Sequence, residues 1–459
     1  MITTPFFPIK QAVSPSASNP GNPSTHEGPL DPEVVYRQTR PSDWLKMPDV
    51  SETPGNLYAL VLIPQGAVAY FPLNISGSEV KIEYGYTDSN GSFITTEVAS
   101  AAAIGRFDGM IDSSDFSNIT SDGHVQCMVR ISYQEGAPFI LFTRPLGDSE
   151  FSWVSPIREI SCNVCGISFG GFYPALKQMK YFYGIGFSAP FSMFKDNISL
   201  IAVRRLEMRN FNDASYYFCG CSSLIAIPQI DFSHIYEFSG VFKDCISLEY
   251  LPELNTVQAD RVEEMFAGCI SLKELPLMDT SEVNVFTSFL KDCISIKEIG
   301  FLDTSSGTDF DEMFSGCIGL RKIPAIDTTR AYSMTNMFKS CSALTTVPAL
   351  HTERLSNLNL FYDSAITSLI NLPVSETTQA ISFENMHALC RVTLACDGWE
   401  GCDISFLGTF LSRDAYVEFF QSLPETTGVY TITIGNVLGN SGLSDEDKYI
   451  ARNKGWTVL

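Results

Sequence analysis

The sequence has little positive charge and few histidines. Of its 459 residues, 30 are Lys or Arg and 52 are Asp or Glu, which gives a formal charge of −22, and only five are His. Nucleic-acid binders need cationic patches that neutralise phosphates, and adsorption to anionic membranes needs clustered Lys and Arg. The charge balance therefore argues against nucleic acid and against an anionic lipid surface as partners.

The sequence also lacks a long apolar run and a secretory leader. The longest uncharged apolar stretch, residues 57–73, is broken in its middle by Pro64, Gln65 and Gly66, whereas a spanning helix needs ~20 apolar residues. Residues 1–5 have neither the basic nor the apolar part of an export signal. We therefore expect no membrane insertion, and we expect the cysteines to be thiols of a reducing compartment.

Motifs for catalysis or cofactor binding are missing as well. Cys162 and Cys165 form a lone C-x-x-C without the second pair that a zinc site needs. We find no phosphate-binding glycine loop and no recognisable acid/base pair of carboxylates. The sequence thus predicts no metal, no cofactor and no enzymatic activity. Glycan hydrolysis stays open as an alternative, because it needs only two carboxylates ~5–9.5 Å apart.

Two zones precede the main part of the chain. Residues 1–32 contain seven prolines, which prevent regular structure and predict a flexible tail. This tail could become ordered on a partner, with Phe6, Phe7 and Ile9 as anchors. Residues 33–150 alternate short apolar runs with turn signals, which predicts a small all-β sandwich that attaches the protein to its partner.

Residues 151–400 contain an internal repeat. Cysteines recur every 24 residues, at positions 221, 245, 269, 293, 317 and 341. Each unit reads approximately Met-Phe-x-x-Cys-x-Ser-Leu-x-x-Leu-Pro-x-x-Asp-Thr, as in residues 265–280. Asn197 stands one period before the first of these cysteines, and we place Ile366 at the cysteine position of a weaker last unit. A fixed period of this size predicts stacked units that share one core.

The chemistry of the unit predicts its geometry. Met-Phe-x-x-Cys suits a short helical turn on the inner side, and Leu-x-x-Leu suits an extended run that pairs in parallel at ~4.8 Å per rung. Asp-Thr opens the next turn through its side-chain oxygens. The cysteine column then lies inside the rod, as small apolar side chains without disulfides or metal.

The two residues between the repeat leucines should point outward. In register, Lys273, Lys297 and Arg321 form a cationic column on an acidic protein, with Tyr250 and Lys322 beside it. One interpretation is a solvated face with cross-strand ion pairs. The other is a contact surface for an acidic glycan or a neighbouring protein.

Residues 401–459 predict a helix–strand–helix–strand unit that seals the open end of the solenoid. Ser412 can cap a helix that runs to Leu423. Ser444 and Asp447 have the spacing of a capping box for a second helix, which Gly455 ends.

These residues carry two resemblances. The repeat of residues 193–373 resembles the BspA-type leucine-rich repeats of bacterial surface proteins, which implies a leucine-rich-repeat solenoid and a role in adhesion or ligand binding. Residues 36–45, and residues 432–435 with 443–447 and 454–458, are similar to segments of bacteriophage tail and other virion proteins.

The sequence therefore predicts an α/β repeat solenoid, like leucine-rich repeats, after a small all-β sandwich and a flexible tail. We interpret the chain as a bacteriophage virion structural protein, such as a tail fibre, a whisker or collar fibre, or a decoration protein. Its N-terminal part would bind other virion proteins, and its solenoid would bind a host-surface glycan or protein; we expect a homotrimer if it oligomerises. A virion location would explain the missing export signal. The alternatives are a bacterial BspA-like surface adhesin and a glycan-degrading tail spike.

Overall fold

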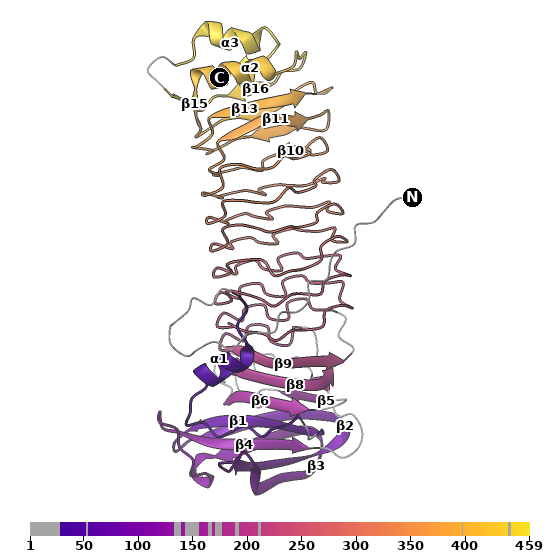
Figure 1. Cartoon of the computed structure of the whole chain (residues 1–459), viewed down its shortest axis with the longest axis vertical. Helices are drawn as coiled ribbons and strands as arrows, with labels where there is room; N and C mark the ends of the chain where they lie inside the picture. The colour runs from indigo at the N-terminus through magenta and orange to yellow at the C-terminus, as the bar shows by residue number, and fades with distance from the viewer. Residues whose placement is uncertain are drawn as a thin grey trace, which may run out of the picture.

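The protein is an elongated rod with a β-sheet domain at one end and two short helices at the other (Figure 1). The computed structural model describes residues 28–51, 54–132, 139–142, 156–163, 168–169, 177–188, 192–209, 213–396, 398–438 and 442–459. The proposed anchors Phe6, Phe7 and Ile9, and most of the proline-rich tail, lie outside these residues. None of the described helices is long and apolar enough to cross a membrane.

The N-terminal elements are α1 (Pro32–Thr39), β1 (Asn56–Pro64), β2 (Val68–Thr87), β3 (Phe93–Asp112), a 3-10 turn (Ser113–Asp115), β4 (His124–Ser132), β5 (Phe139–Phe142), β6 (Ile157–Asn163), β7 (Ser168–Phe169), β8 (Tyr181–Ser188) and β9 (Ala202–Arg209). The C-terminal elements are β10 (Asn357–Leu358), β11 (Ser368–Val374), β12 (Ala380–Ser382), β13 (Arg391–Cys396), β14 (Asp403–Ser405), β15 (Phe410–Ser412), α2 (Arg413–Ser422), β16 (Thr431–Thr433), β17 (Asn436–Leu438), α3 (Asp445–Arg452) and β18 (Thr457–Val458).

The N-terminal strands form one sheet in the order β3-β2-β4-β1-β6-β8-β7-β5, with β9 paired to β8. The long strand β2 pairs with β3, with β4 and with β5 in different parts of its length. The sheet therefore returns on itself and encloses an apolar interior. A second small core, which includes Val35, Trp44 and Met47, covers the other face of the sheet under α1.

The sheet continues directly into the solenoid. Strands β6, β8 and β9 pair in parallel. A parallel bridge between Ala202 and Ala226 continues this pairing into the next rung. A single cluster of buried apolar side chains extends from Leu57 in β1 to Val458 in β18. The predicted repeat solenoid is confirmed, and it shares one core with the sheet domain.

Each rung turns through a series of hydrogen-bonded bends. In the unit around Cys269, backbone N–H groups donate to the carbonyls three residues earlier, at 3.0–3.1 Å, from Met265, Ala267, Cys269 and Leu272. The intervening N–H groups of Phe266 and Gly268 donate instead to Phe289 and Lys291 of the next rung, at 3.1 and 2.8 Å. Parallel bridges between neighbouring rungs add to this pairing, as from Arg261 to Val285 and from Glu298 to Lys322.

The expected short helical turn is therefore wrong. Glu264 and Gly268 adopt left-handed φ angles of 53° and 74°, which a helix does not tolerate. These angles turn alternate N–H groups away from their own chain and toward the next rung. The corresponding residues two units later, Glu312 and Gly316, have φ angles of 55° and 75°, so the bend belongs to the repeat.

The six repeat cysteines are fully buried and free of disulfides, as the sequence predicts. Each thiol also donates a hydrogen bond to a backbone carbonyl 27 residues earlier, at 3.0–3.2 Å. Cys269, for example, bonds to Phe242 at 3.0 Å. The thiol is therefore a donor between rungs, in addition to a small apolar side chain that fills space.

The end of the cysteine column differs from the prediction. Ser364, not Ile366, follows Cys341, because Phe361 stacks on Phe338 at 5.8 Å and Asp363 repeats the left-handed φ of Ser340. The unit here is one residue shorter than 24. Asn197, at the start of the column, is buried with neither amide atom hydrogen-bonded.

A ladder of phenylalanine rings runs through the core beside the cysteines. Phe194, Phe218, Phe242 and Phe266 stack with centroids 5.3–5.8 Å apart and nearly parallel planes. The next position in this ladder is Leu290, and Phe289 fills the space by meeting Phe266 edge-on at 5.4 Å. The core thus keeps an aromatic contact where the repeat departs from its pattern.

Alternate rungs also differ in charge, with a period of two units. Lysines two residues before the cysteine position contact the following rung: Lys243 pairs with Glu264 at 2.8 Å and Lys291 with Glu312 at 2.6 Å. In the first of these rungs, Asp196 follows Lys195. If Gly220 of the next rung carried a Cβ atom, that atom would lie 2.7 Å from Asp196 Oδ1. Glycine in one rung thus makes room for aspartate in its neighbour.

The C-terminal unit continues the spiral to its last strand. Strands β10, β12, β14, β16 and β18 form one parallel sheet in that order. The predicted caps are present: Ser412 accepts from the Ala415 N–H at 3.1 Å, and Ser444 and Asp447 form the capping box of α3. Helix α2 packs Tyr416, Phe419 and Phe420 against the core.

The buried thiols predict an alkaline loss of stability. Burial raises the pKa of the column thiols, including Cys269 and Cys293, above their ordinary value of 9.0. The unfolded chain therefore releases these protons first as the pH rises, so the stabilisation is complete below pH 9.0 and declines above it, by up to ~1.4 kcal/mol per pH unit for each thiol. Urea unfolding across this range measures the slope.

A double Cys269→Ala/Cys293→Ala variant should show a shallower alkaline slope than the parent, and Cys390→Ala should not, because Cys390 is exposed. Equal slopes for the parent and the double variant would contradict this account of the column.

Candidate binding surfaces

The cationic column predicted from the repeat is present on the surface of the solenoid. Lys273, Lys297, Arg321 and Lys322 are exposed. Their rungs are in register, since the Lys273 N–H donates to Glu249 at 3.0 Å and the Arg321 N–H donates to Lys297 at 2.8 Å. The structure thus brings these side chains together as the sequence predicts.

The charges along this column are not equivalent. Lys273 pairs with Glu249 and lies over the Tyr250 ring, 5.2 Å from its centroid. The hydrogen bond to Glu249 raises the pKa of Lys273. Lys273 and Tyr250 therefore fit the cross-strand ion-pair interpretation.

Lys297, Arg321 and Lys322 make no ion pair with any residue that the structure describes. They lie on two neighbouring rungs of an acidic chain, together with the exposed Glu298, which follows Lys297 and is bridged through its backbone to Lys322. We name these three residues the cationic group.

A stripe of isoleucines lies beside the cationic column, with one isoleucine three residues before each of Lys273, Lys297 and Arg321. Ile246, Ile270, Ile294 and Ile318 directly follow repeat cysteines and are 36–45% exposed. Our sequence interpretation did not single out this stripe. The recurrence of isoleucine after cysteine in four consecutive units was the signal that could have revealed it. Cations and half-exposed isoleucines together make an amphipathic face.

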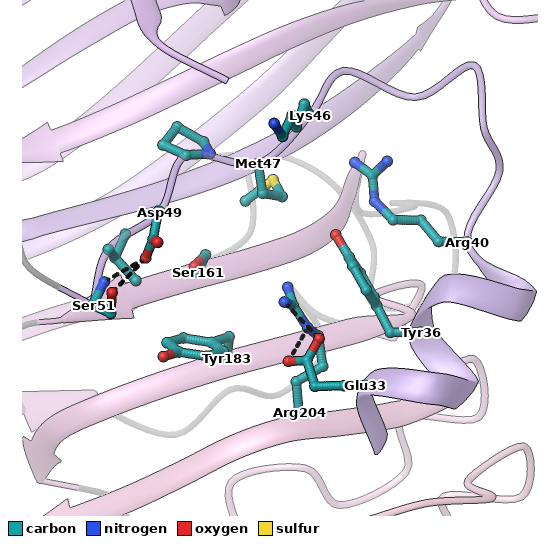
Figure 2. A pocket seen from close by; sticks show the side chains of 12 residues that line it. Glu33, Tyr36, Arg40, Lys46, Met47, Asp49, Ser51, Ser161, Tyr183 and Arg204 are labelled. Atoms are coloured by element: carbon teal, nitrogen blue, oxygen red, sulfur yellow. Dashed lines mark hydrogen bonds and ion pairs between the residues drawn. The ribbon is translucent and has the colours of Figure 1, made fainter. Parts of the chain in front are cut away.

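A cavity of about 480 Å³ lies where α1 and residues 46–51 meet strands β6, β8 and β9 (Figure 2). Tyr36, Met47, Ser161, Tyr183 and Arg204 are among the residues that line it. Our sequence interpretation missed this site, since its walls come from segments more than a hundred residues apart and no local motif joins them.

The wall of the cavity is held by a buried carboxylate, Glu159 on β6. Its oxygens accept hydrogen bonds from the Tyr36 hydroxyl at 2.7 Å and from Arg40 Nε at 2.8 Å. Burial and the negative charge of Glu159 raise the pKa of Tyr36, so its hydroxyl stays protonated and donates. These bonds attach helix α1 to the sheet.

Arg204 on β9 completes this network. Its Nε and Nη2 donate to the Glu33 carboxylate at 2.9 and 3.1 Å, and its guanidinium lies 3.7 Å from the Tyr36 ring centroid. Burial opposes its charge, but the hydrogen bonds to Glu33 and the nearby negative groups prevail and raise the pKa of Arg204. Helix α1 and strands β6 and β9 are thus joined through the carboxylates of Glu33 and Glu159.

Within the ranges that the structure describes, no group of three or more His, Cys, Asp or Glu side chains could hold a metal ion. Cys165, the second half of the C-x-x-C, falls outside those ranges.

Comparisons with known proteins bear on the repeats. A sequence family described as a Mycoplasma protein of unknown function, DUF285, matches residues 189–299 and 261–372. Among solved structures, the chain is similar to a leucine-rich repeat protein from Eubacterium ventriosum, with 11% identity and a TM-score of 0.27. That similarity covers 52% of this chain and 92% of the other. A search of curated proteins finds no match.

The Glu159 network predicts how α1 is held. Glu159→Gln leaves Arg40 and Arg204 without their shared partner, and breaking a buried pair in this way costs ~3–5 kcal/mol. We expect a lower melting temperature and faster tryptic cleavage at Arg37 of α1. Glu207→Gln is the matched control, because Glu207 makes an exposed pair with Arg205, which is worth ~0–1 kcal/mol. Equal effects of the two changes would contradict the role of Glu159.

Proposed function

We propose that this protein is a binding protein that presents its amphipathic solenoid face to an acidic ligand on a cell surface, in the manner of a bacterial BspA-like adhesin. The observation that carries the proposal is the cationic group, Lys297, Arg321 and Lys322, which makes no ion pair within the described part of a chain whose formal charge is −22. Unpaired cations on an acidic rod concentrate the attraction for an anionic partner at one place.

The isoleucine stripe supports the same surface. Charged groups alone give steering and salt-sensitive attraction, whereas close contact with apolar area adds affinity that salt does not screen. Ile294 and Ile318 stand on the same rungs as Lys297 and Arg321. A ligand that spans the rungs can therefore contact both kinds of side chain.

The adhesin interpretation is better supported than the virion role. The family match covers the repeats and is described for a bacterial genus. The virion role rests on short terminal segments, and the proposed anchors lie outside the described residues. Neither the family nor the solved structure reported above is described as a virion protein. Antibodies against the repeats should label intact source cells; labelling confined to phage particles would reverse this preference.

The binding surface has a direct test. A Lys297→Ser/Arg321→Ser/Lys322→Ser variant should bind chondroitin sulfate at least about tenfold more weakly, because each exposed cation contributes ~0.5–1 kcal/mol. The loss should be largest at low ionic strength. Biolayer interferometry on immobilised glycan measures it.

The matched control is Lys243→Ser/Lys291→Ser/Lys339→Ser, which removes the same charge from another column of the solenoid. It should retain most of the binding. Parental affinity in the first variant, or an equal loss in both, would contradict a site at the cationic group.

A further inference from the structure

The cavity beside α1 has the size of a small-molecule site. Its volume of about 480 Å³ lies within the ~300–1,000 Å³ usual for ligand pockets. The side chains that face it come from α1, from residues 46–51 and from three adjacent strands (Figure 2). It lies at the N-terminal sheet and shares no residue with the cationic group, so the inference below does not depend on the proposed function.

The floor of the cavity contains the hydroxyl of Ser161. Ser161 is 3% exposed, and its Oγ makes no hydrogen bond to another residue that the structure describes. Because this Oγ is not among the sealed, unpartnered polar atoms of the described side chains, it is open to the cavity and can bond to a ligand. The neighbouring hydroxyl of Tyr183 accepts a bond from Arg205 at 3.3 Å and keeps its own proton free to donate.

The charges around the cavity cancel. Arg40, Arg204 and Lys46 are balanced by Glu33, Asp49 and the underlying Glu159. Arg40 already donates to Glu159 and to the carbonyls of Trp44 and Leu45. Arg204 already donates to Glu33. An ionic ligand therefore gains no net attraction here, whereas a neutral polar ligand can use the lone pairs and protons that remain.

The apolar part of the lining is flat. Tyr183 is half-buried and Met47 is buried beside it, and one face of Tyr36 is already covered by Arg204. Arg204 also lies over the Tyr183 ring, but farther away, at 5.4 Å from its centroid, so Tyr183 offers the less covered aromatic surface. A pyranose ring matches this combination, because it has C–H groups on its face and hydroxyls, each both donor and acceptor, around its edge.

We propose that this cavity binds one neutral pyranose unit of a glycan. The ring packs against Tyr183, and its hydroxyls bond to Ser161 Oγ, to the Asp49 carboxylate and to Lys46. Lys46 Nζ donates one hydrogen bond to the Asn90 carbonyl at 3.2 Å, and an ammonium group has further N–H groups that can donate to a ligand. The Asp49 carboxylate accepts from the Ser51 hydroxyl at 2.7 Å and from the Ser51 N–H at 2.9 Å, and a carboxylate oxygen can accept more than one hydrogen bond.

The experiment titrates the full chain with the methyl glycosides of glucose, galactose and N-acetylglucosamine, followed by saturation-transfer NMR and calorimetry. At least one of these sugars should bind. Ser161→Ala should weaken that binding about three- to tenfold through the loss of one hydrogen bond, at an unchanged melting temperature. Tyr183→Ala should abolish it, while Tyr332→Ala, an exposed tyrosine of the solenoid, should bind like the parent.

Three results would overturn the proposal. One is that none of the three glycosides binds. Another is that Ser161→Ala and Asp49→Asn, two small changes that preserve the fold, leave the affinity unaltered. The last is that a blocked Gly-Ser-Gly peptide binds in the cavity while the sugars do not, which would assign the site to peptide.

Discussion

The structure depends on the hydrogen bond between each repeat thiol and a carbonyl of the preceding rung. At this position the side chain must be small enough for a fully packed interior and must still donate to a carbonyl, such as that of Phe242, which also accepts from the Cys245 N–H of its own turn at 3.1 Å. Alanine would fit without donating, and serine would donate at the cost of burying a stronger polar group. Cysteine meets both requirements, since its thiol is a weak donor on a largely apolar side chain. The period of the sequence follows from this constraint.

Much of the fold could be predicted from the sequence because the decisive signals are local or periodic. The spacing of the cysteines fixes the stacked units, and the caps at Ser412 and Ser444 act within three residues of the side chain. The conformation inside a unit could not be derived in this way. The left-handed angle at Glu264 is imposed by pairing with the next rung and overrides a residue type that favours helix. The displacement of the column to Ser364 likewise depends on the stacking of Phe361.

The two candidate surfaces also differ in how far the sequence could predict them. Lys297 and Arg321 occupy equal places in successive units, so repetition alone puts them side by side. Which lysine stays free was not visible in the sequence, because the pairing of Lys273 with Glu249 depends on side-chain geometry across rungs. The cavity beside α1 joins Tyr36 to Ser161 and Tyr183, and only the pairing of β1 with β6 and of β6 with β8 brings these segments together.

Glycine and aspartate alternate at the position before five of the repeat cysteines, from Gly220 to Gly316, and this alternation restricts how the rod can change length. Asp244 occupies the space that Gly268 leaves open, and Asp292 does the same for Gly316. Gain or loss of a single unit would set two aspartates, or two glycines, against each other. Gain or loss of a pair of units restores every neighbour. Duplication and deletion in this lineage are therefore least disruptive in steps of 48 residues, twice the cysteine spacing.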